Sequence, residues 1–190
     1  MTLNFVKMSD QNTVVKVSDR SFKHYITHDK IQLSVQKIAQ QIDIDYKGKT
    51  PLFLIVLNGA FIFASDLLKK ITIDCEIGFL RVSSYQGMDT TEKIREVLGI
   101  DEDLNNRDII LVEDIVDTGI TMEHVLNVIH SKGASSVKIA TLLFKKGKFQ
   151  KSFPVDYVGF SIPNDFVVGY GLDYNGLGRN LKNIYSVVEE

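Results

Sequence analysis

Short, largely apolar segments are spaced along the sequence and limit the folds that this chain can adopt. Leu52–Leu57 reads Leu-Phe-Leu-Ile-Val-Leu and contains no polar residue, which is typical of a strand buried on both faces of a parallel sheet. Further buried strands are predicted over residues 109–112, 137–144 and 155–161. Because parallel strands need crossover connections, helical segments are expected between them.

Amphipathic segments do separate these strands. Apolar side chains in and just after residues 29–41 recur at intervals of four, three and four, at Ile31, Val35, Ile38 and Ile42, which places them on one helical face. Thr27 or Asp29 can cap the start of this helix. Another helix is predicted over residues 121–131, and Gly133 is expected to end it.

The remaining segments complete an alternating pattern of strands and helices. The Asn58-Gly59 turn leads into a helix that ends near Lys70, and residues 76–83 are predicted to form a strand. Residues 84–92 form a polar loop before a returning strand at 94–100. The pattern predicts an α/β fold with a mostly parallel, twisted sheet flanked by helices, and residues 1–190 as a single domain.

Composition excludes several classes of protein. The chain carries 22 Lys and Arg against 24 Asp and Glu, so it lacks the excess of cations expected of a nucleic-acid binder. The longest uncharged stretch, residues 50–65, is shorter than the roughly 20 residues that span a bilayer. The N-terminus has no continuous apolar stretch typical of a signal peptide, and the single cysteine, Cys75, favours a reducing compartment. We therefore expect a cytoplasmic protein that binds neither nucleic acid nor membranes.

The segment after Val112 concentrates the chemistry. It reads Glu-Asp-Ile-Val-Asp-Thr-Gly-Ile-Thr over residues 113–121. Its three carboxylates repel one another unless a cation, donated hydroxyls or solvent compensates them. Gly119 and the two threonines lead into a helix, whose first N–H groups can bind a phosphate. The segment therefore suits a sugar phosphate, because its carboxylates can bind sugar hydroxyls or a metal next to a phosphate-binding helix start. The alternatives are a metal site, a solvated turn or simple helix capping.

This segment resembles the signature of purine phosphoribosyltransferases that use phosphoribosyl pyrophosphate. From about residue 52 to 187 the chain resembles hypoxanthine(-guanine) phosphoribosyltransferases. Further matches occur in order at Val56-Leu57-Asn58-Gly59, Ser84-Tyr85, Leu142-Leu143-Phe144-Lys145, Phe166-Val167-Val168-Gly169-Tyr170, Leu172-Asp173-Tyr174-Asn175 and Arg179. The resemblance implies the type I phosphoribosyltransferase fold, with a small hood formed by N- and C-terminal segments. It also implies purine salvage, in which a 6-oxopurine attacks C1 of the ribose, pyrophosphate leaves, and IMP or GMP forms.

The resemblance also implies roles for the acidic segment. Glu113 and Asp114 are expected to bind the ribose hydroxyls and associated Mg2+. Asp117 is expected to lie near N7 of the purine and act in proton transfer, which requires an approach of about 3 Å. The phosphoribosyl 5-phosphate is expected to lie against Asp117, Thr118, Gly119, Ile120 and Thr121.

Other implied residues bind pyrophosphate. Asn58 and Gly59 correspond to the pyrophosphate loop, where related enzymes often have Lys in place of Asn58 and some hold the preceding peptide cis. Arg179 is then the main cation for pyrophosphate. Ser84-Tyr85 opens a long polar loop that is expected to close over the reacting centre and exclude water.

The purine is expected to contact a second group of residues. Lys145 donates to the 6-oxo group, Phe166 stacks on the base, the Val167 main chain reads the base edge, and Asp173 binds the Mg2+ that bridges pyrophosphate. Each has a simpler explanation in isolation: a surface lysine, a core aromatic residue or a local cap.

Two other functions remain possible from the sequence. One is a regulator that senses phosphoribosyl pyrophosphate without catalysis, although such proteins lose the base-reading residues or carry a basic patch. The other is a phosphoribosyltransferase for xanthine, because the choice among 6-oxopurines depends on the main chain around Val167 and on Asp173. The resemblance further implies a homodimer or homotetramer.

Overall fold

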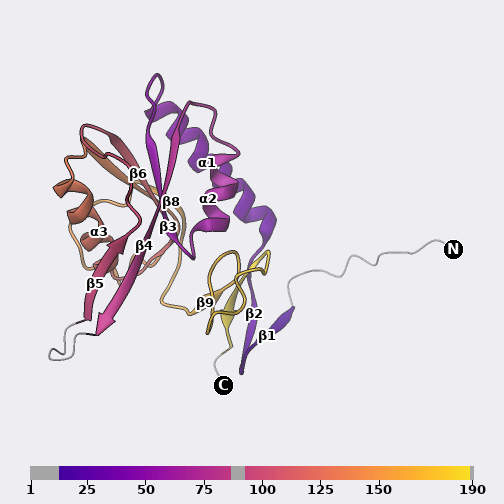
Figure 1. The fold of residues 1–190 in the computed structure, drawn as a ribbon. Helices are drawn as coiled ribbons and strands as arrows, with labels where there is room; N and C mark the ends of the chain where they lie inside the picture. Colours follow the sequence, from indigo (N-terminus) through magenta and orange to yellow (C-terminus); the bar gives the residue numbers. More distant parts are fainter. Residues whose placement is uncertain (1–12, 87–92, 189–190) are drawn as a thin grey trace.

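The computed structural model describes residues 13–86 and 93–188, without the side chains of residues 83–98. Two sheets make up the fold (Figure 1). The large sheet contains β3 Leu52–Leu57, β4 Glu76–Gln86, β5 Lys93–Leu98, β6 Asp108–Val116, β7 Ser136–Phe144 and β8 Tyr157–Ser161. The small sheet contains β1 Val14–Val17, β2 Arg20–Ile26, β9 Val167–Val168 and β10 Ile184–Val187. The helices are α1 His28–Asp45, α2 Phe61–Leu68 and α3 Ile120–Ser131.

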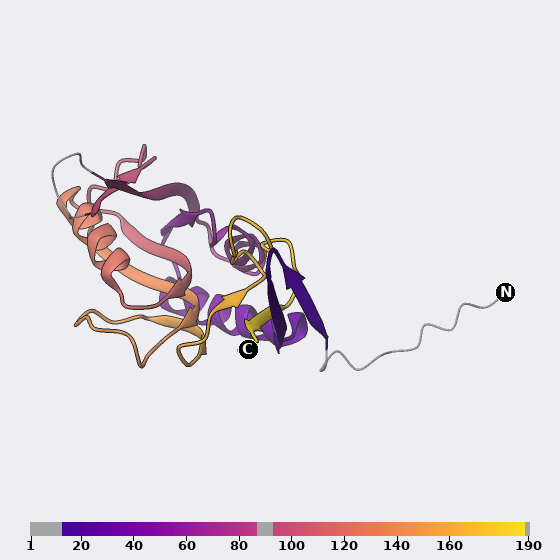
Figure 2. The same ribbon diagram turned by 90° about the horizontal axis from the view of Figure 1, so that it is seen from below.

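The large sheet has the strand order β5-β4-β3-β6-β7-β8. Strands β4, β3, β6, β7 and β8 run parallel, and β5 pairs antiparallel with β4. Helices α1 and α2 cover one face and α3 the other (Figure 2). Phe53 and Ile55 pack into the core beneath α1 and α2, whereas Leu52 and Leu54 pack toward α3. This two-sided burial explains why β3 carries no polar residue.

The small sheet joins the two ends of the chain, as the predicted hood requires. Its order is β1-β2-β10-β9, so N-terminal strands pair with C-terminal ones. A separate apolar cluster holds it together, comprising Val17, Phe22, Val168 and Tyr185. The short strand β9 directly follows Phe166, which brings this sheet close to the carboxyl ends of the parallel strands.

Several boundaries differ from the sequence prediction. The predicted strand at 109–112 extends to Val116, because β6 stays paired with β7 up to the register Val116↔Phe144. Glu113 and Asp114 therefore lie within a strand and not in a loop. Likewise β4 continues to Gln86, since it pairs with β5.

Some predictions concern residues that the structure does not describe, and four observed strands were not predicted. Ser84 and Tyr85 lie in β4, but their side chains are outside the described part, as are residues 87–92 of the predicted polar loop. Residues 1–12 also lie outside it. Strands β1, β2, β9 and β10 were not predicted, because each is too short or too mixed in polarity to give a periodic signal. In the described residues, no helix is both long and apolar enough to cross a membrane.

Candidate functional site

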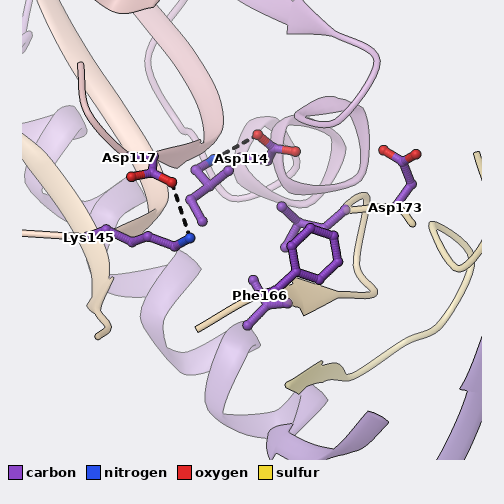
Figure 3. Close-up of a pocket in the computed structure, with 8 residues that line it drawn as sticks. Asp114, Asp117, Lys145, Phe166 and Asp173 are labelled. Carbon is purple, nitrogen blue, oxygen red and sulfur yellow. Dashed lines mark hydrogen bonds and ion pairs between the residues drawn. The ribbon is translucent and has the colours of Figure 1, made fainter. Parts of the chain in front are cut away.

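Two cavities lie side by side at the carboxyl end of β6. The larger, of about 290 Å³, is lined by Asp114, Ile115, Asp117, Lys145, Phe166, Val167, Leu172 and Asp173 (Figure 3). The smaller, of about 90 Å³, is lined by Glu113, Ile115, Val116, Asp117, Thr118, Gly119, Thr121 and Met122. Asp117 borders both. Ligands of open α/β sheets bind at the carboxyl ends of the strands. The fold therefore brings the predicted residues in these two linings to the edge of the sheet where a ligand is expected.

The smaller cavity lies against the start of α3. Gly119 begins this helix with φ +83, a left-handed conformation that glycine adopts readily. A Cβ there would lie 2.6 Å from the Phe149 ring, so the site also lacks room for any side chain. The Ile120 N–H donates weakly to Thr118 Oγ1 at 3.4 Å. The first N–H groups of a helix carry partial positive charge, so this cavity suits an anion.

Asp117 faces a buried cation from the neighbouring strand. Lys145, only 7 % exposed, follows β7, and its Nζ lies 3.2 Å from Asp117 Oδ2 (Figure 3). Lys148 Nζ lies 3.6 Å from the same oxygen. Asp117 Oδ1 is buried and accepts no hydrogen bond from any described residue. One carboxylate oxygen is thus held by cations while the other can accept a proton or a hydrogen bond from a ligand.

Glu113 and Asp114 form a poorly compensated pair of buried carboxylates. Burial raises the pKa of Asp114 to about 6, despite the hydrogen bond that its Oδ1 accepts from the Ile115 N–H at 2.7 Å. Burial and the neighbouring charge of Asp114 also raise the pKa of Glu113 well above its usual value. Glu113 Oε2 is buried and has no partner among the described residues. A ligand that brings positive charge or hydroxyl donors would relieve both groups.

This pair can contribute to a magnesium site without forming a complete one. In the described part of the chain, no group of three His, Cys, Asp or Glu side chains could hold a metal. Mg2+ is commonly bound through one or two carboxylates together with substrate phosphates and water. The unpartnered oxygen of Glu113 and the raised pKa values therefore fit a Mg2+ ion that arrives with a phosphorylated ligand.

Two glycine-containing loops meet beside Asp114. A Cβ on Gly59 would lie 1.8 Å from Asp114 Oδ2, and a Cβ on Gly171 would lie 2.1 Å from the Gly59 carbonyl oxygen. Only glycine at both positions allows this approach. The Leu57-Asn58 peptide is cis, as the resemblance suggested, and the Asn58 side chain is exposed.

Arg179 and Asp173 are held together on the second of these loops. Arg179 Nη1 donates to the Gly171 carbonyl at 2.7 Å, and Nη2 lies 2.6 Å from Asp173 Oδ1. Asp173 Oδ2 accepts the Gly176 N–H at 2.8 Å. Asp173 thus caps a turn and pairs with Arg179, while it also lines the larger cavity. The predicted roles of both residues remain predictions.

Phe166 forms one wall of the larger cavity. Its ring is 44 % exposed and packs against Tyr174, edge to face with a centroid distance of 5.8 Å. Phe22 contacts it at 6.3 Å. Val167 is buried, and its backbone pairs with Ser186 of β10. The ring is therefore oriented by the small sheet while it remains accessible to a planar ligand.

Most of the predicted residues come together here, with some exceptions. Asn58, Gly59, Arg179 and Ile120 line neither cavity. Ile120 is 45 % exposed, so only its backbone can contribute. Sequence reasoning missed Lys148, although its spacing of three from Lys145 was a visible signal. It also missed Gly171, whose importance depends on its contact with a loop more than 100 residues away.

Comparison with known proteins gives one consistent result. Residues 22–175 match the model of the phosphoribosyl transferase domain. The chain is 38% identical over 169 residues to the hypoxanthine-guanine phosphoribosyltransferase of Streptococcus pneumoniae, covering 88% of this chain and 94% of that protein. It is also 38% identical over 163 residues to the bifunctional protein TilS/HprT of Listeria innocua, where the match covers 85% of this chain but spans only 25% of the longer protein.

Solved structures agree with the sequence comparisons. The fold is similar to a hypoxanthine-guanine phosphoribosyltransferase from Bacillus anthracis, with a TM-score of 0.79, 35% identity, and coverage of 87% of this chain and 96% of that chain. A hypoxanthine phosphoribosyltransferase from Staphylococcus aureus gives a TM-score of 0.79 at 37% identity, with coverage of 87% and 91%.

Because Asp114 is buried, removing its charge is expected to stabilise the fold. Between pH 3.8 and about 6, folded Asp114 holds a proton that the unfolded chain has released, so the free energy of unfolding falls as pH rises through this range. In a buffer that contains a chelator at pH 7.5, we expect Asp114→Asn to raise the free energy of unfolding by about 3 kcal/mol. The gain should vanish near pH 4. Urea unfolding of both proteins at the two pH values measures it, and a variant less stable than the wild type at pH 7.5 would contradict the prediction.

Proposed function

The chain belongs to the hypoxanthine(-guanine) phosphoribosyltransferase family, and we propose that it transfers the 5-phosphoribosyl group from phosphoribosyl pyrophosphate to hypoxanthine and guanine in purine salvage. The products are IMP or GMP and pyrophosphate. The observation that carries this proposal is the position of Asp117 between the two cavities, with Lys145 Nζ 3.2 Å from its Oδ2. The Asp117 carboxylate therefore lies between the proposed phosphate-binding cavity and the proposed base-binding cavity.

The smaller cavity binds the 5-phosphate. Its anion-binding groups are the first N–H groups of α3 and the hydroxyls of Thr118 and Thr121, which line the cavity. Because the helix N-terminus supplies partial positive charge, this seat needs no lysine or arginine. The ribose then lies toward Glu113 and Asp114, whose carboxylates accept hydrogen bonds from the 2- and 3-hydroxyls. They also stabilise the positive charge that builds on the ribose as pyrophosphate leaves.

The larger cavity binds the purine. Phe166 stacks on one face of the ring, and the main chain of Val167 reads its edge. Lys145 has only donors, so it favours a 6-oxo over a 6-amino group. Asp117 Oδ1, which no described residue donates to, accepts the proton at N7 as C1 is attacked.

Magnesium is the proposed cofactor, held by Glu113, Asp114 and Asp173 together with oxygens of the substrate. When bound, it neutralises charge on the pyrophosphate and so makes it a better leaving group. Arg179 is the proposed protein cation for pyrophosphate, alongside the Asn58-Gly59 backbone. Asn58 carries no charge where related enzymes often have lysine, so this protein should depend strongly on the metal.

The described site favours catalysis over ligand sensing. A regulator has no need of a donor-only side chain and a stacking ring in the base pocket, yet Lys145 and Phe166 both line it. Whether xanthine is also a substrate depends on contacts at the base edge. The proposed location is the cytoplasm. The polar segment that begins at Ser84 and Tyr85, at the end of β4, is proposed to cover the reacting centre.

We also propose that the chain forms a homodimer or homotetramer. On the α1 and α2 face, Ile77 and Phe79 of β4 are 48% and 49% exposed, and Phe61 at the start of α2 is 49% exposed. Strands of parallel sheets are usually covered on both faces, so a second copy of the chain is the proposed partner for this apolar surface. For one similar enzyme of solved structure, the hypoxanthine phosphoribosyl transferase of Trypanosoma cruzi, the C-terminal region has been studied for its role in the oligomeric state.

The activity is tested by mixing the protein with phosphoribosyl pyrophosphate, Mg2+ and hypoxanthine, guanine or xanthine, and following the ultraviolet change. We expect nucleotide formation with hypoxanthine and guanine. Asp117→Ala should lower kcat by about a hundredfold to ten-thousandfold while the variant remains folded at the assay temperature, although loss of the ion pair with Lys145 should lower its Tm. No nucleotide with any 6-oxopurine would refute the proposed function, and unchanged turnover in the variant would remove the role of Asp117.

Metal dependence is tested in the same assay. After exhaustive treatment with a chelator, nucleotide formation should stop, because two buried carboxylates and an uncharged Asn58 leave pyrophosphate poorly neutralised. Added MgCl2 should restore activity in a saturable manner. Full activity in the metal-free buffer would show that the protein side chains suffice.

Assembly is tested by light scattering on a size-exclusion column. We expect a molar mass of two or four times the 21.4 kDa of one chain. Phe79→Glu, which puts a charge into the exposed apolar surface, should shift the protein toward the monomer. A wild-type monomer at micromolar concentration would contradict the proposal.

A further inference from the structure

Tyr170 makes a hydrogen bond that the proposed chemistry does not use. It lies between Gly169 and Gly171, is 2% exposed, and its hydroxyl donates to Asp66 Oδ2 at 2.6 Å. Gln32 Nε2 donates to the same oxygen at 2.5 Å. Asp66 belongs to α2 and Gln32 to α1. A side chain of the loop beside the site is thus anchored to the two helices beneath it, and we call this group of three residues the Tyr170 anchor.

The charge state of the anchor favours a strong bond. Although burial raises the pKa of Asp66, hydrogen bonds from Tyr170, Gln32 and Lys69 hold that pKa below its ordinary value. Burial and the Asp66 carboxylate raise the pKa of Tyr170 above its ordinary value. At neutral pH a neutral hydroxyl therefore donates to an ionised carboxylate, and such charge-assisted bonds are about twice as strong as neutral ones.

The anchor leads directly to the proposed pyrophosphate-binding residues. Tyr170 has φ +51, a conformation that non-glycine residues rarely adopt, so its buried side chain helps to hold the backbone there. The next residue, Gly171, donates its N–H to the Arg179 carbonyl at 2.9 Å. The Gly171 carbonyl accepts from Arg179 Nη1 at 2.7 Å, and Arg179 in turn pairs with Asp173. Moving Tyr170 would move the residue that positions Arg179.

Asp66, at the other end of the Tyr170 anchor, is connected through α2 to the Asn58-Gly59 turn. Asp66 lies in α2, which starts two residues after Gly59. Gly171 lies so close to the Gly59 carbonyl that a Cβ on it would be 2.1 Å away. The hydrogen bond between α2 and Tyr170 therefore fixes the spacing between the Asn58-Gly59 turn and the loop that carries Arg179.

We propose that Tyr170 and Asp66 are positioning residues for the pyrophosphate half of the site. Their hydrogen bond sets the distance between the two loops that hold pyrophosphate. This inference rests on the proposed function. It predicts a selective effect, because the residues proposed to hold the base, Lys145 and Phe166, are positioned by β6 and by aromatic packing in the hood and not by Asp66.

Tyr170→Phe tests the proposal because it removes one hydroxyl and keeps the ring. We expect the KM for phosphoribosyl pyrophosphate to rise about tenfold, as for loss of a hydrogen bond to a charged group. The KM for hypoxanthine should stay within about twofold. In Asp66→Asn the amide oxygen can still accept from Tyr170, so most of the affinity should be retained, whereas Asp66→Ala should behave like Tyr170→Phe.

Tyr157→Phe is a matched control. Tyr157 is also buried, and its hydroxyl donates to Asp45 Oδ2 at 2.7 Å. This pair joins the first residue of β8 to the end of α1, at the amino-terminal edge of the sheet and away from both cavities. The control should lower the Tm by a similar amount and leave both KM values unchanged, so it separates loss of stability from loss of positioning.

The outcomes separate this inference from the proposed function. If the wild type forms nucleotides but Tyr170→Phe changes the two KM values no differently from Tyr157→Phe, the positioning role is wrong. If Tyr170→Phe does not fold, the KM values of Asp66→Ala and Asp66→Asn are compared instead. A KM for phosphoribosyl pyrophosphate that rises no more in Asp66→Ala than in Asp66→Asn would then show that the positioning role is wrong. If the wild type forms no nucleotide, the proposed function fails. The positioning role is then tested by calorimetry, which measures the Kd for phosphoribosyl pyrophosphate in the presence of MgCl2. A tenfold weaker Kd for Tyr170→Phe would support positioning, and equal affinity or no binding by the wild type would overturn it.

Discussion

Two buried carboxylates, those of Glu113 and Asp114, lie near the end of β6, and their cost shapes the site around them. Continued pairing with β7 carries Glu113 and Asp114 into the sheet, where burial raises both pKa values. Isolated charges in such surroundings are costly. The surrounding parts can be understood as responses to this cost: the positive charge of Arg179 favours ionised Asp114, and the proposed magnesium ion and ribose hydroxyls would complete the compensation.

This constraint also explains the placement of glycines around the site. The Gly59 turn can approach Asp114 only without a side chain, and the Gly171 loop can approach Gly59 only on the same condition. Three segments distant in sequence therefore converge on one small region of the molecule. Close approach of this kind leaves little tolerance for error, which is why a hydrogen bond between Tyr170 and α2 can control the spacing of the loops.

The sequence predicted much of the large sheet and of the site, because both leave strong local signals. The apolar run of β3 has its predicted bounds, and α3 begins within one residue of the expected position. The acidic segment and the block from Phe166 to Arg179 identified the family and most of the cavity-lining residues. The prediction placed Glu113 and Asp114 in a loop, because polar residues normally end a buried strand. Pairing with a neighbouring strand overrides that local preference.

Local residue patterns are enough to predict the alternation of strands and helices, the glycine that starts α3, and the residue types available for chemistry. These follow from periodicity and from backbone groups that any chain with this local pattern would present. Packing between distant elements, in contrast, pairs Asp117 with Lys145 and Lys148, places Gly171 against Gly59, and brings Tyr170 to Asp66. These contacts join residues on different elements, up to 112 positions apart, and no local pattern encodes the packing that brings them within reach.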